Sequence, residues 1–124
     1  MPSLAERALA GPPAGAASAM ALLMRLGDGF LPARARGVRA TIEWRVDLEG
    51  SEERLWMRID DGDWLVTRDA LDPTLAVALS AVDLRELLDR RVSGVDLFLA
   101  QRLVVDGDVL LAVRLADFFG LPVR

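Results

Sequence analysis

Residues 41–48 constrain the fold more than any other part of this sequence, because apolar and polar side chains alternate along them without a break. The apolar positions are Ile42, Trp44, Val46 and Leu48. Successive side chains of a β-strand point to opposite faces, so the pattern predicts a strand with one dry face and one wet face. Such a strand is typical of an antiparallel sheet that is covered on one side only.

The next two segments predict strands that continue the same sheet as a meander. Residues 54–59 alternate again, which places Trp56 among arginines on the outer face. Asp61 and Gly62 then form a strong two-residue hairpin signal, leading into a strand over residues 63–68. Trp64 begins that strand close to the turn, and we expect its side chain to be half exposed.

Two further strands are predicted in the second half of the chain. Residues 74–80 carry apolar or small side chains on both faces, so we expect an inner strand with another layer packed closely over it. Residues 102–106 form the last strand, and Gly107 turns the chain after it.

Helical spacing of apolar residues predicts four helices, over residues 16–27, 82–92, 95–100 and 109–119. The second of these should bury Leu84, Leu87 and Leu88 and expose Asp83 on its polar face. Asp108 is placed to cap the last helix. A short helix is also expected near the N-terminus, because residues 3–6 have the spacing of a capping box.

The order of these elements predicts an α+β fold with helices collected on one face of a sheet. A chain of 124 residues has the size of a single domain. We expect residues 1–15 to form an N-terminal helix or extension and residues 16–124 to form the folded domain.

Composition narrows the possible functions. Cysteine, histidine, tyrosine and lysine are absent, which removes disulfides, thiol nucleophiles, Schiff bases, histidine relays and the usual nitrogen and sulfur metal ligands. The net charge of −4 argues against nucleic-acid binding. No apolar run approaches the roughly 20 residues of a membrane span, and the N-terminus has no signal-peptide pattern, so a cytoplasmic protein is expected.

Carboxylates gather at two places, near the hairpin and at Asp106 and Asp108 before the last helix, where helix capping accounts for Asp108. Asp60, Asp61 and Asp63 superficially resemble a calcium loop, but no glutamate occupies the twelfth position of that motif. Turn chemistry accounts for Asp61 next to Gly62. We therefore predict no metal site.

The stretch over residues 98–115 resembles the C-terminal signature of the sterol carrier protein type two family. In that family an aromatic residue opens a turn, a short strand follows, and a Gly-Asp pair starts a helix rich in aliphatic residues. The matching positions are Phe98, Leu103, Val105, Gly107, Asp108, Ala112 and Leu115. Gln101 departs from the pattern, because the family usually has glycine there, between the aromatic turn and the last strand. Either the loop is rebuilt, or the amide of Gln101 faces the ligand.

The resemblance implies a five-stranded, mostly antiparallel sheet with helices over one face. It also implies an apolar tunnel between the two layers that takes fatty acyl chains, sterols or acyl-CoA. The resemblance implies no cofactor, no metal and no catalytic residue. The candidate pocket residues are Trp44, Met57, Leu87, Leu88, Phe98, Gln101, Leu103, Val105, Leu111, Leu115, Phe118 and Phe119.

The last predicted helix supports a pocket independently, because Arg114 and Asp117 are its only polar residues. A helix that is apolar nearly all round must be covered on more than one side. A sheet on one side and a ligand or partner on the other would satisfy this, and so would simple burial in a core.

Three functions remain open from the sequence. The first is non-catalytic binding or transfer of a lipid or another apolar small molecule. The second is a biosynthetic accessory or cyclase-like enzyme that holds a polyketide, isoprenoid or quinone intermediate, with a carboxylate as acid or base. The third is an interaction module for a partner enzyme, or a homodimer, through the closing helix.

Overall fold

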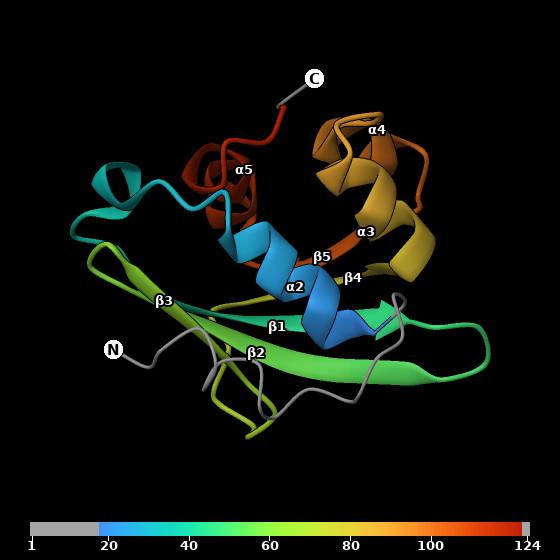
Figure 1. Ribbon diagram of the computed structural model, residues 1–124, viewed down its shortest axis with the longest axis horizontal. Helices are drawn as coiled ribbons and strands as arrows, with labels where there is room; N and C mark the ends of the chain where they lie inside the picture. Colours follow the sequence, from blue (N-terminus) through green and yellow to red (C-terminus); the bar gives the residue numbers. More distant parts are fainter. Residues whose placement is uncertain (1–17, 123–124) are drawn as a thin grey trace.

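The computed structural model describes residues 18–122, which form a five-stranded sheet with helices on one face (Figure 1). The strand order is β3-β2-β1-β4-β5. The α+β architecture is therefore confirmed. The helix predicted over residues 3–6, the extension over residues 1–15 and the first residues of the helix predicted from residue 16 lie outside the described residues.

The first three strands form the predicted meander. They are β1 (Arg39–Asp47), β2 (Glu52–Asp60) and β3 (Asp63–Thr67), and each is antiparallel to the next. Between β2 and β3, Asp61 and Gly62 both have positive φ, at 48° and 85°, as a type I′ turn requires. The predicted two-residue hairpin is therefore confirmed.

The other two strands are β4 (Leu75–Ser80) and β5 (Val104–Gly107). β4 runs parallel to β1 and antiparallel to β5, so it is an inner strand, as its two-sided apolar pattern predicts. Because β3 lies at one edge and β4 beyond β1, the connection between them crosses the sheet on the face away from the helices (Figure 1).

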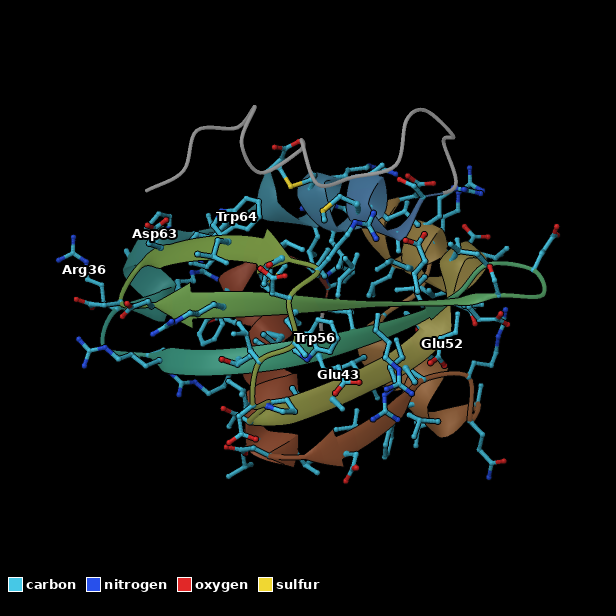
Figure 2. The ribbon with its side chains drawn as sticks, turned by 90° about the horizontal axis from the view of Figure 1, so that it is seen from below. Arg36, Glu43, Glu52, Trp56, Asp63 and Trp64 are labelled. Carbon is cyan, nitrogen blue, oxygen red and sulfur yellow. The ribbon has the colours of Figure 1, made fainter. Side chains whose placement is uncertain are left out.

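That outer face carries the polar half of the alternation. Figure 2 views it directly, with Glu43 of β1 beside Trp56 of β2, its partner in the strand register. Trp56 is partly buried, and Glu43 is only 7% exposed, with Arg45 Nε 2.8 Å from its Oε2. The placement of Trp56 on the outer face is confirmed.

The helical layer comprises α2 (Ala19–Gly27), α3 (Ala81–Leu88), α4 (Gly94–Leu99) and α5 (Val109–Phe118), together with a 3-10 turn, η1 (Pro32–Ala35). Ser18, Ser80, Ser93 and Asp108 cap the four helices by accepting hydrogen bonds from backbone N–H groups. Within residues 18–122, no helix combines the length and the apolarity needed to cross a bilayer.

Two expectations about α3 were wrong. The helix ends at Leu88 rather than near Val92, because Arg90 adopts a left-handed conformation with φ 61° and turns the chain. Asp83 is also not on the exposed face: it is 4% exposed and pairs with Arg102, which lies beyond α4. A distant cation of this kind leaves no trace in the local periodicity of the helix.

Trp64 is the other correction, because its side chain is 6% exposed rather than half exposed. Its ring packs against Gly27 at the end of α2, where an added Cβ would lie 2.1 Å from ring carbons. Glycine therefore lets α2 approach β3 closely enough to cover the indole.

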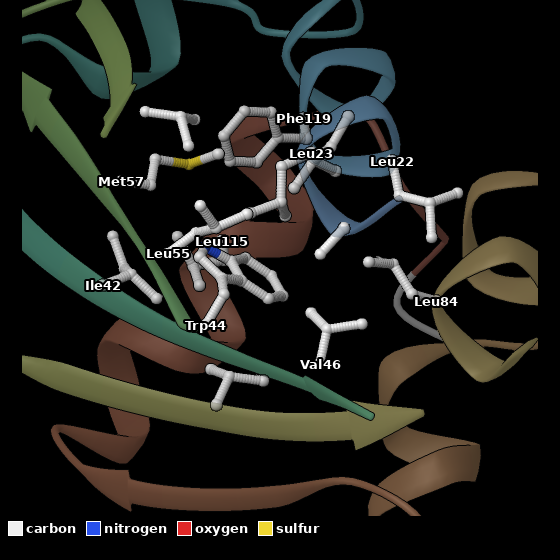
Figure 3. Close-up of a cluster of buried hydrophobic side chains, with 14 of the residues drawn as sticks. Leu22, Leu23, Ile42, Trp44, Val46, Leu55, Met57, Leu84, Leu115 and Phe119 are labelled. Carbon is white, nitrogen blue, oxygen red and sulfur yellow. The ribbon is translucent and has the colours of Figure 1, made fainter. Parts of the chain in front are cut away.

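The core lies between the sheet and the helices and is continuous from α2 to α5. Figure 3 shows its centre, where Trp44 and Val46 of β1 meet Leu23 of α2 and Leu115 of α5. The largest fully buried side chain is that of Phe118, which anchors α5 to this core.

Candidate functional site

An apolar pocket of about 200 Å³ lies beside this core, between α5, α4 and the sheet. It is lined by Leu26, Trp44, Val77, Leu87, Gly94, Val95, Phe98, Leu103, Val105, Val109, Ala112, Val113, Leu115, Ala116, Phe119, Leu121 and Pro122. Among these described residues there is no charged side chain, and the indole N–H of Trp44 is the only hydrogen-bonding side-chain group.

The floor of the pocket is a row of side chains that crosses three strands. Trp44 of β1 is paired with Val77 of β4, and Val77 is paired with Val105 of β5. Residues paired across neighbouring strands point to the same face. The parallel pairing of β1 with β4 therefore builds the floor from parts of the chain that are distant in sequence.

α5 presents two apolar stripes, one to the core and one to the pocket. The core stripe consists of Leu111, Leu115 and Phe118, which are at most 7% exposed, and Leu115 also borders the pocket. The pocket stripe consists of Val109, Ala112, Val113 and Ala116. Val109 and Val113 remain 55% and 54% exposed although they line the pocket, so the pocket opens to the surface along this stripe.

The start of α5 is fixed by the Gly-Asp pair. Gly107 has φ 112°, and a Cβ there would lie 2.6 Å from the carbonyl oxygen of Thr74. A side chain at this position is thus excluded by both backbone conformation and space. Asp108 then accepts a hydrogen bond from the backbone N–H of Leu111, which begins the helix.

α4 forms the opposite wall through Gly94, Val95 and Phe98. The helix begins with a capping box, in which Ser93 and Asp96 each accept a hydrogen bond from the other's backbone N–H. Leu97 is its single buried residue, whereas Phe98 is 50% exposed at the mouth of the pocket.

Gln101 ends α4 in a left-handed conformation, with φ 61°. Its N–H donates to the carbonyl of Phe98, and the N–H of Arg102 donates to that of Leu97. These two bonds form a Schellman motif, in which glycine is the preferred residue at the left-handed position. The backbone at Gln101 therefore has the left-handed conformation that glycine would favour.

Arg102 also ties this loop to α3. Its Nε lies 3.1 Å from Asp83 Oδ2, and its Nη2 pairs with Oδ1, so the contact is bidentate. The Asp83 side chain is 6% exposed and that of Arg102 is 58% exposed. The ion pair fixes the position of the α4 wall relative to α3.

Seven of the twelve residues predicted from the sequence line the pocket: Trp44, Leu87, Phe98, Leu103, Val105, Leu115 and Phe119. Met57, Leu111 and Phe118 lie in the core instead. Leu88 is partly buried and Gln101 is exposed, and neither lines the pocket. Whether any of the twelve contacts a ligand stays a prediction.

Sequence reasoning missed ten lining residues. They are Leu26, Val77, Gly94, Val95, Val109, Ala112, Val113, Ala116, Leu121 and Pro122. The stripe on α5 was present in the sequence as i, i+3, i+4, i+7 spacing, parallel to the stripe that faces the core. No local sequence pattern identifies Val77 or Leu26 as lining residues, because their place in the pocket depends on how distant strands and helices pack together.

The carboxylates near the hairpin have structural roles. Asp60 pairs with Arg39 at 2.9 Å, and this hydrogen bond raises the pKa of the Arg39 guanidinium. Asp61 accepts a hydrogen bond from the N–H of Gly37, and Asp63 accepts one from that of Trp64. Among the described residues, no three acidic side chains come together as a metal-binding group.

Comparison with known families decides the classification, because residues 21–120 match the SCP-2 sterol transfer family. The chain belongs to this family. A sequence comparison with curated proteins found no similar protein.

Solved structures of two SCP2 proteins and of part of a sulfatase share the fold. The solution structure of palmitated SCP2L2 from Aedes aegypti aligns with a TM-score of 0.61 at 17% identity, covering 75% of this chain and 82% of that one. Sterol Carrier Protein 2 from Yarrowia lipolytica, in its apo form, gives 0.52 at 23% identity, covering 60% and 67%. The sec-alkylsulfatase Pisa1 from Pseudomonas sp. gives 0.62 at 20% identity, covering 82% of this chain but 15% of that enzyme.

Proposed function

We propose that this SCP2 domain binds a lipid or a similar apolar small molecule in the pocket between α4, α5 and the sheet, and carries it without changing it chemically. The observation that carries the proposal is the apolar lining of that pocket, which reaches the surface through Phe98, Val109 and Val113. Half-exposed apolar side chains gathered around a hollow are typical of a ligand-binding groove.

Burial alone can supply the affinity. Each methylene moved from water into such a pocket contributes about 0.8 kcal/mol, so a chain of about a dozen methylenes outweighs the cost of association. The palmitated SCP2L2 from Aedes aegypti, which shares this fold, supports a long acyl chain as a ligand of suitable shape.

The cyclase alternative requires a carboxylate on the pocket wall to act as acid or base. The lining residues within 18–122 include none, so the proposal is binding rather than catalysis.

The proposal is tested with two matched pairs of variants. Phe98 lines the pocket whereas its neighbour Leu99, which is 73% exposed, does not. On α5, Val113 lines the pocket and Leu110, which is 77% exposed, does not. All four side chains are at least half exposed, so replacing any of them by aspartate leaves the core intact.

Binding of a pyrene-labelled acyl methyl ester is measured by fluorescence titration. We expect Phe98→Asp and Val113→Asp to weaken binding by about tenfold or more, because a charge then faces the apolar chain. Leu99→Asp and Leu110→Asp should bind as the wild type does. Equal affinity in all five proteins, or no binding by the wild type, would contradict the proposal; native mass spectrometry then checks for co-purified lipid.

A second candidate function is an interaction module, and the exposure of Leu99 and Leu110 outside the pocket favours it. The Pisa1 sulfatase, in which the similar region is a small part of a longer enzyme, supports the same idea. Sedimentation velocity tests a second copy of the chain as the partner. A wild-type dimer that Leu110→Asp converts to a monomer would support it, and a monomeric wild type would exclude self-association.

A further inference from the structure

α4 is the least anchored wall of the pocket. The floor is fixed by the strand pairing of Trp44, Val77 and Val105, and α5 is anchored to the core by its buried stripe. α4 has one buried side chain, that of Leu97, and lies on the opposite side of the pocket from α5 (Figure 1). Of these walls, α4 therefore moves at the lowest cost in buried apolar surface.

The size of the pocket gives a reason for such a movement. Its volume is about 200 Å³, whereas sites that bury most of a small molecule usually measure about 300–1,000 Å³. A chain of about a dozen methylenes therefore requires the pocket to widen by about half or more.

α4 and the turn after it form one unit, residues 92–103, that can move without unfolding. The carbonyl oxygen of Leu97 accepts hydrogen bonds from the N–H groups of Arg102 and Leu103, and the capping box closes the other end of the helix. Before this unit, Arg90 has a left-handed φ of 61°, a conformation that is strained for a residue with a Cβ. A rotation at Arg90 relieves the strain, so this position is suited to be a hinge.

An ion pair holds this unit to α3. Arg102 contacts both carboxylate oxygens of Asp83, through Nε at 3.1 Å and through Nη2. Asp83 is 4% exposed, so its charge needs this partner while the unit stays in place. When the unit moves away, water reaches the carboxylate, and the half-exposed Arg102 is already hydrated. The pair can therefore open without leaving a dry, unpaired charge.

We propose that α4 and its turn are a movable wall, hinged at Arg90, and that the ion pair between Asp83 and Arg102 is the latch that keeps the pocket narrow until a ligand enters. This inference rests on the proposed function and adds how the pocket opens. Breaking the latch is part of the free-energy cost of binding, so a chain without it should bind the ligand more readily.

The first test measures binding of the pyrene-labelled acyl methyl ester to the wild type and to Arg102→Met, by fluorescence titration and stopped-flow fluorescence. Removing the latch raises the fraction of chains with an open pocket. We therefore expect the affinity to rise by about threefold or more and the association to be faster.

The matched control is Arg34→Met, which breaks an ion pair at the other wall. The Arg34 side chain is 56% exposed, close to the 58% of Arg102, and pairs at 2.6 Å with Asp117 of α5. Because the core holds α5 in place, this variant should bind the ester as the wild type does.

The second test observes the movement itself. The chain has no cysteine, so introduced cysteine pairs can be spin-labelled selectively. Leu110→Cys on α5 is combined with Leu99→Cys on α4 or, as the control, with Ala21→Cys on α2; all three side chains are exposed and none lines the pocket. Double electron–electron resonance should show that the distance from Leu99 to Leu110 lengthens when the ester binds, while the control distance stays the same. Because these chains keep Arg102, the measurement decides the matter even if Arg102→Met folds poorly.

The outcomes distinguish this inference from the function on which it rests. A distance from Leu99 to Leu110 that stays fixed in the bound chain overturns the latch while apolar binding stands. An affinity of Arg102→Met equal to or below that of the wild type does the same, as does an equal gain in Arg34→Met. Failure of the ester to bind the wild type overturns the proposed function itself.

Discussion

Two helices are followed by a residue with a side chain in the left-handed conformation that favours glycine. Gln101 follows α4 and Arg90 follows α3, each with φ 61°. At both positions the backbone N–H groups close a Schellman motif, the second through Arg90 to Leu87 and Arg91 to Glu86. For a residue with a Cβ this conformation costs about 1–2 kcal/mol, so glycine at either position is expected to stabilise the fold.

We expect Gln101→Gly to raise the free energy of unfolding by about 1 kcal/mol, after the entropy that glycine loses on folding is deducted. Urea denaturation followed by circular dichroism measures the change. Leu110→Gly is the matched control, because it places glycine at an exposed position inside α5, where it should cost up to about 1 kcal/mol. A destabilised Gln101→Gly protein would mean that the glutamine side chain makes contacts worth more than the backbone strain.

The resemblance drew attention to Gln101 from the sequence alone, since glycine is usual there. It did not predict which of two outcomes holds, a rebuilt loop or an amide that faces the ligand. The hydrogen bonds of the motif depend on backbone atoms, so they tolerate glutamine, and the exposed Gln101 does not line the pocket. Whether its amide contacts a ligand stays a prediction.

At the scale of elements, α4 forms one wall of the pocket and is held to the rest of the fold by few interactions. Leu97 is its one buried side chain, Ser93 caps its start, and Arg102 after its end pairs with Asp83 of α3. Removing the cation would leave a buried carboxylate without its partner, which is more costly than losing a surface pair.

Arg102→Met should therefore lower the free energy of unfolding by about 1–3 kcal/mol, a range reduced from that of a fully buried pair because Arg102 itself is more than half exposed. Adding Asp83→Asn should recover part of the loss, and a double-mutant cycle in urea gives the coupling. The control is Arg91→Met, whose pair with Glu86 is largely exposed and should change stability by less than about 1 kcal/mol. Equal effects of the two arginine variants would contradict this role for Asp83.

Elements with strong local patterns were predictable. The alternation that defines β1 and the Asp61-Gly62 turn depend only on neighbouring residues, and both are confirmed. The burial of Trp64 and of Asp83 could not be predicted, because in each case it depends on a partner that is distant in the sequence. Gly27 allows the indole to be covered, and Arg102 pairs with the carboxylate.

At the scale of the whole molecule, an ion pair between Arg25 and Asp89 links α2 to the end of α3. The hydrogen bond from Arg25 lowers the pKa of Asp89 below its usual range. A carboxyl group with a lower pKa in the folded state stabilises the fold above its ordinary pKa. That contribution is lost as pH falls through the folded-state pKa.

We therefore expect Asp89→Asn to be less stable than the wild type near neutral pH, and the difference to shrink as the solution is acidified through and below the usual carboxyl range. Urea denaturation at a series of pH values measures both proteins. A difference that stays constant with pH would show that the charge of Asp89 contributes nothing to folding.

The pocket depends on the whole molecule, and this limits what its sequence can predict. Trp44 and Val77 become neighbours only through the parallel pairing of β1 with β4. Apolar character placed seven predicted residues on the pocket wall. It could not separate them from Met57, Leu111 and Phe118, because core and pocket select the same side chains.

The lengths of the strands fall from the middle of the sheet to its rims. β1 and β2 have nine residues each and β4 has six, whereas the outermost strands β3 and β5 have five and four. An edge strand has unpaired N–H and C=O groups, with which strands of other chains can pair and form fibrils. A short edge strand offers few such groups. Because its shortest strands lie at the edges of the sheet, this apolar-rich chain offers few sites at which amyloid could grow.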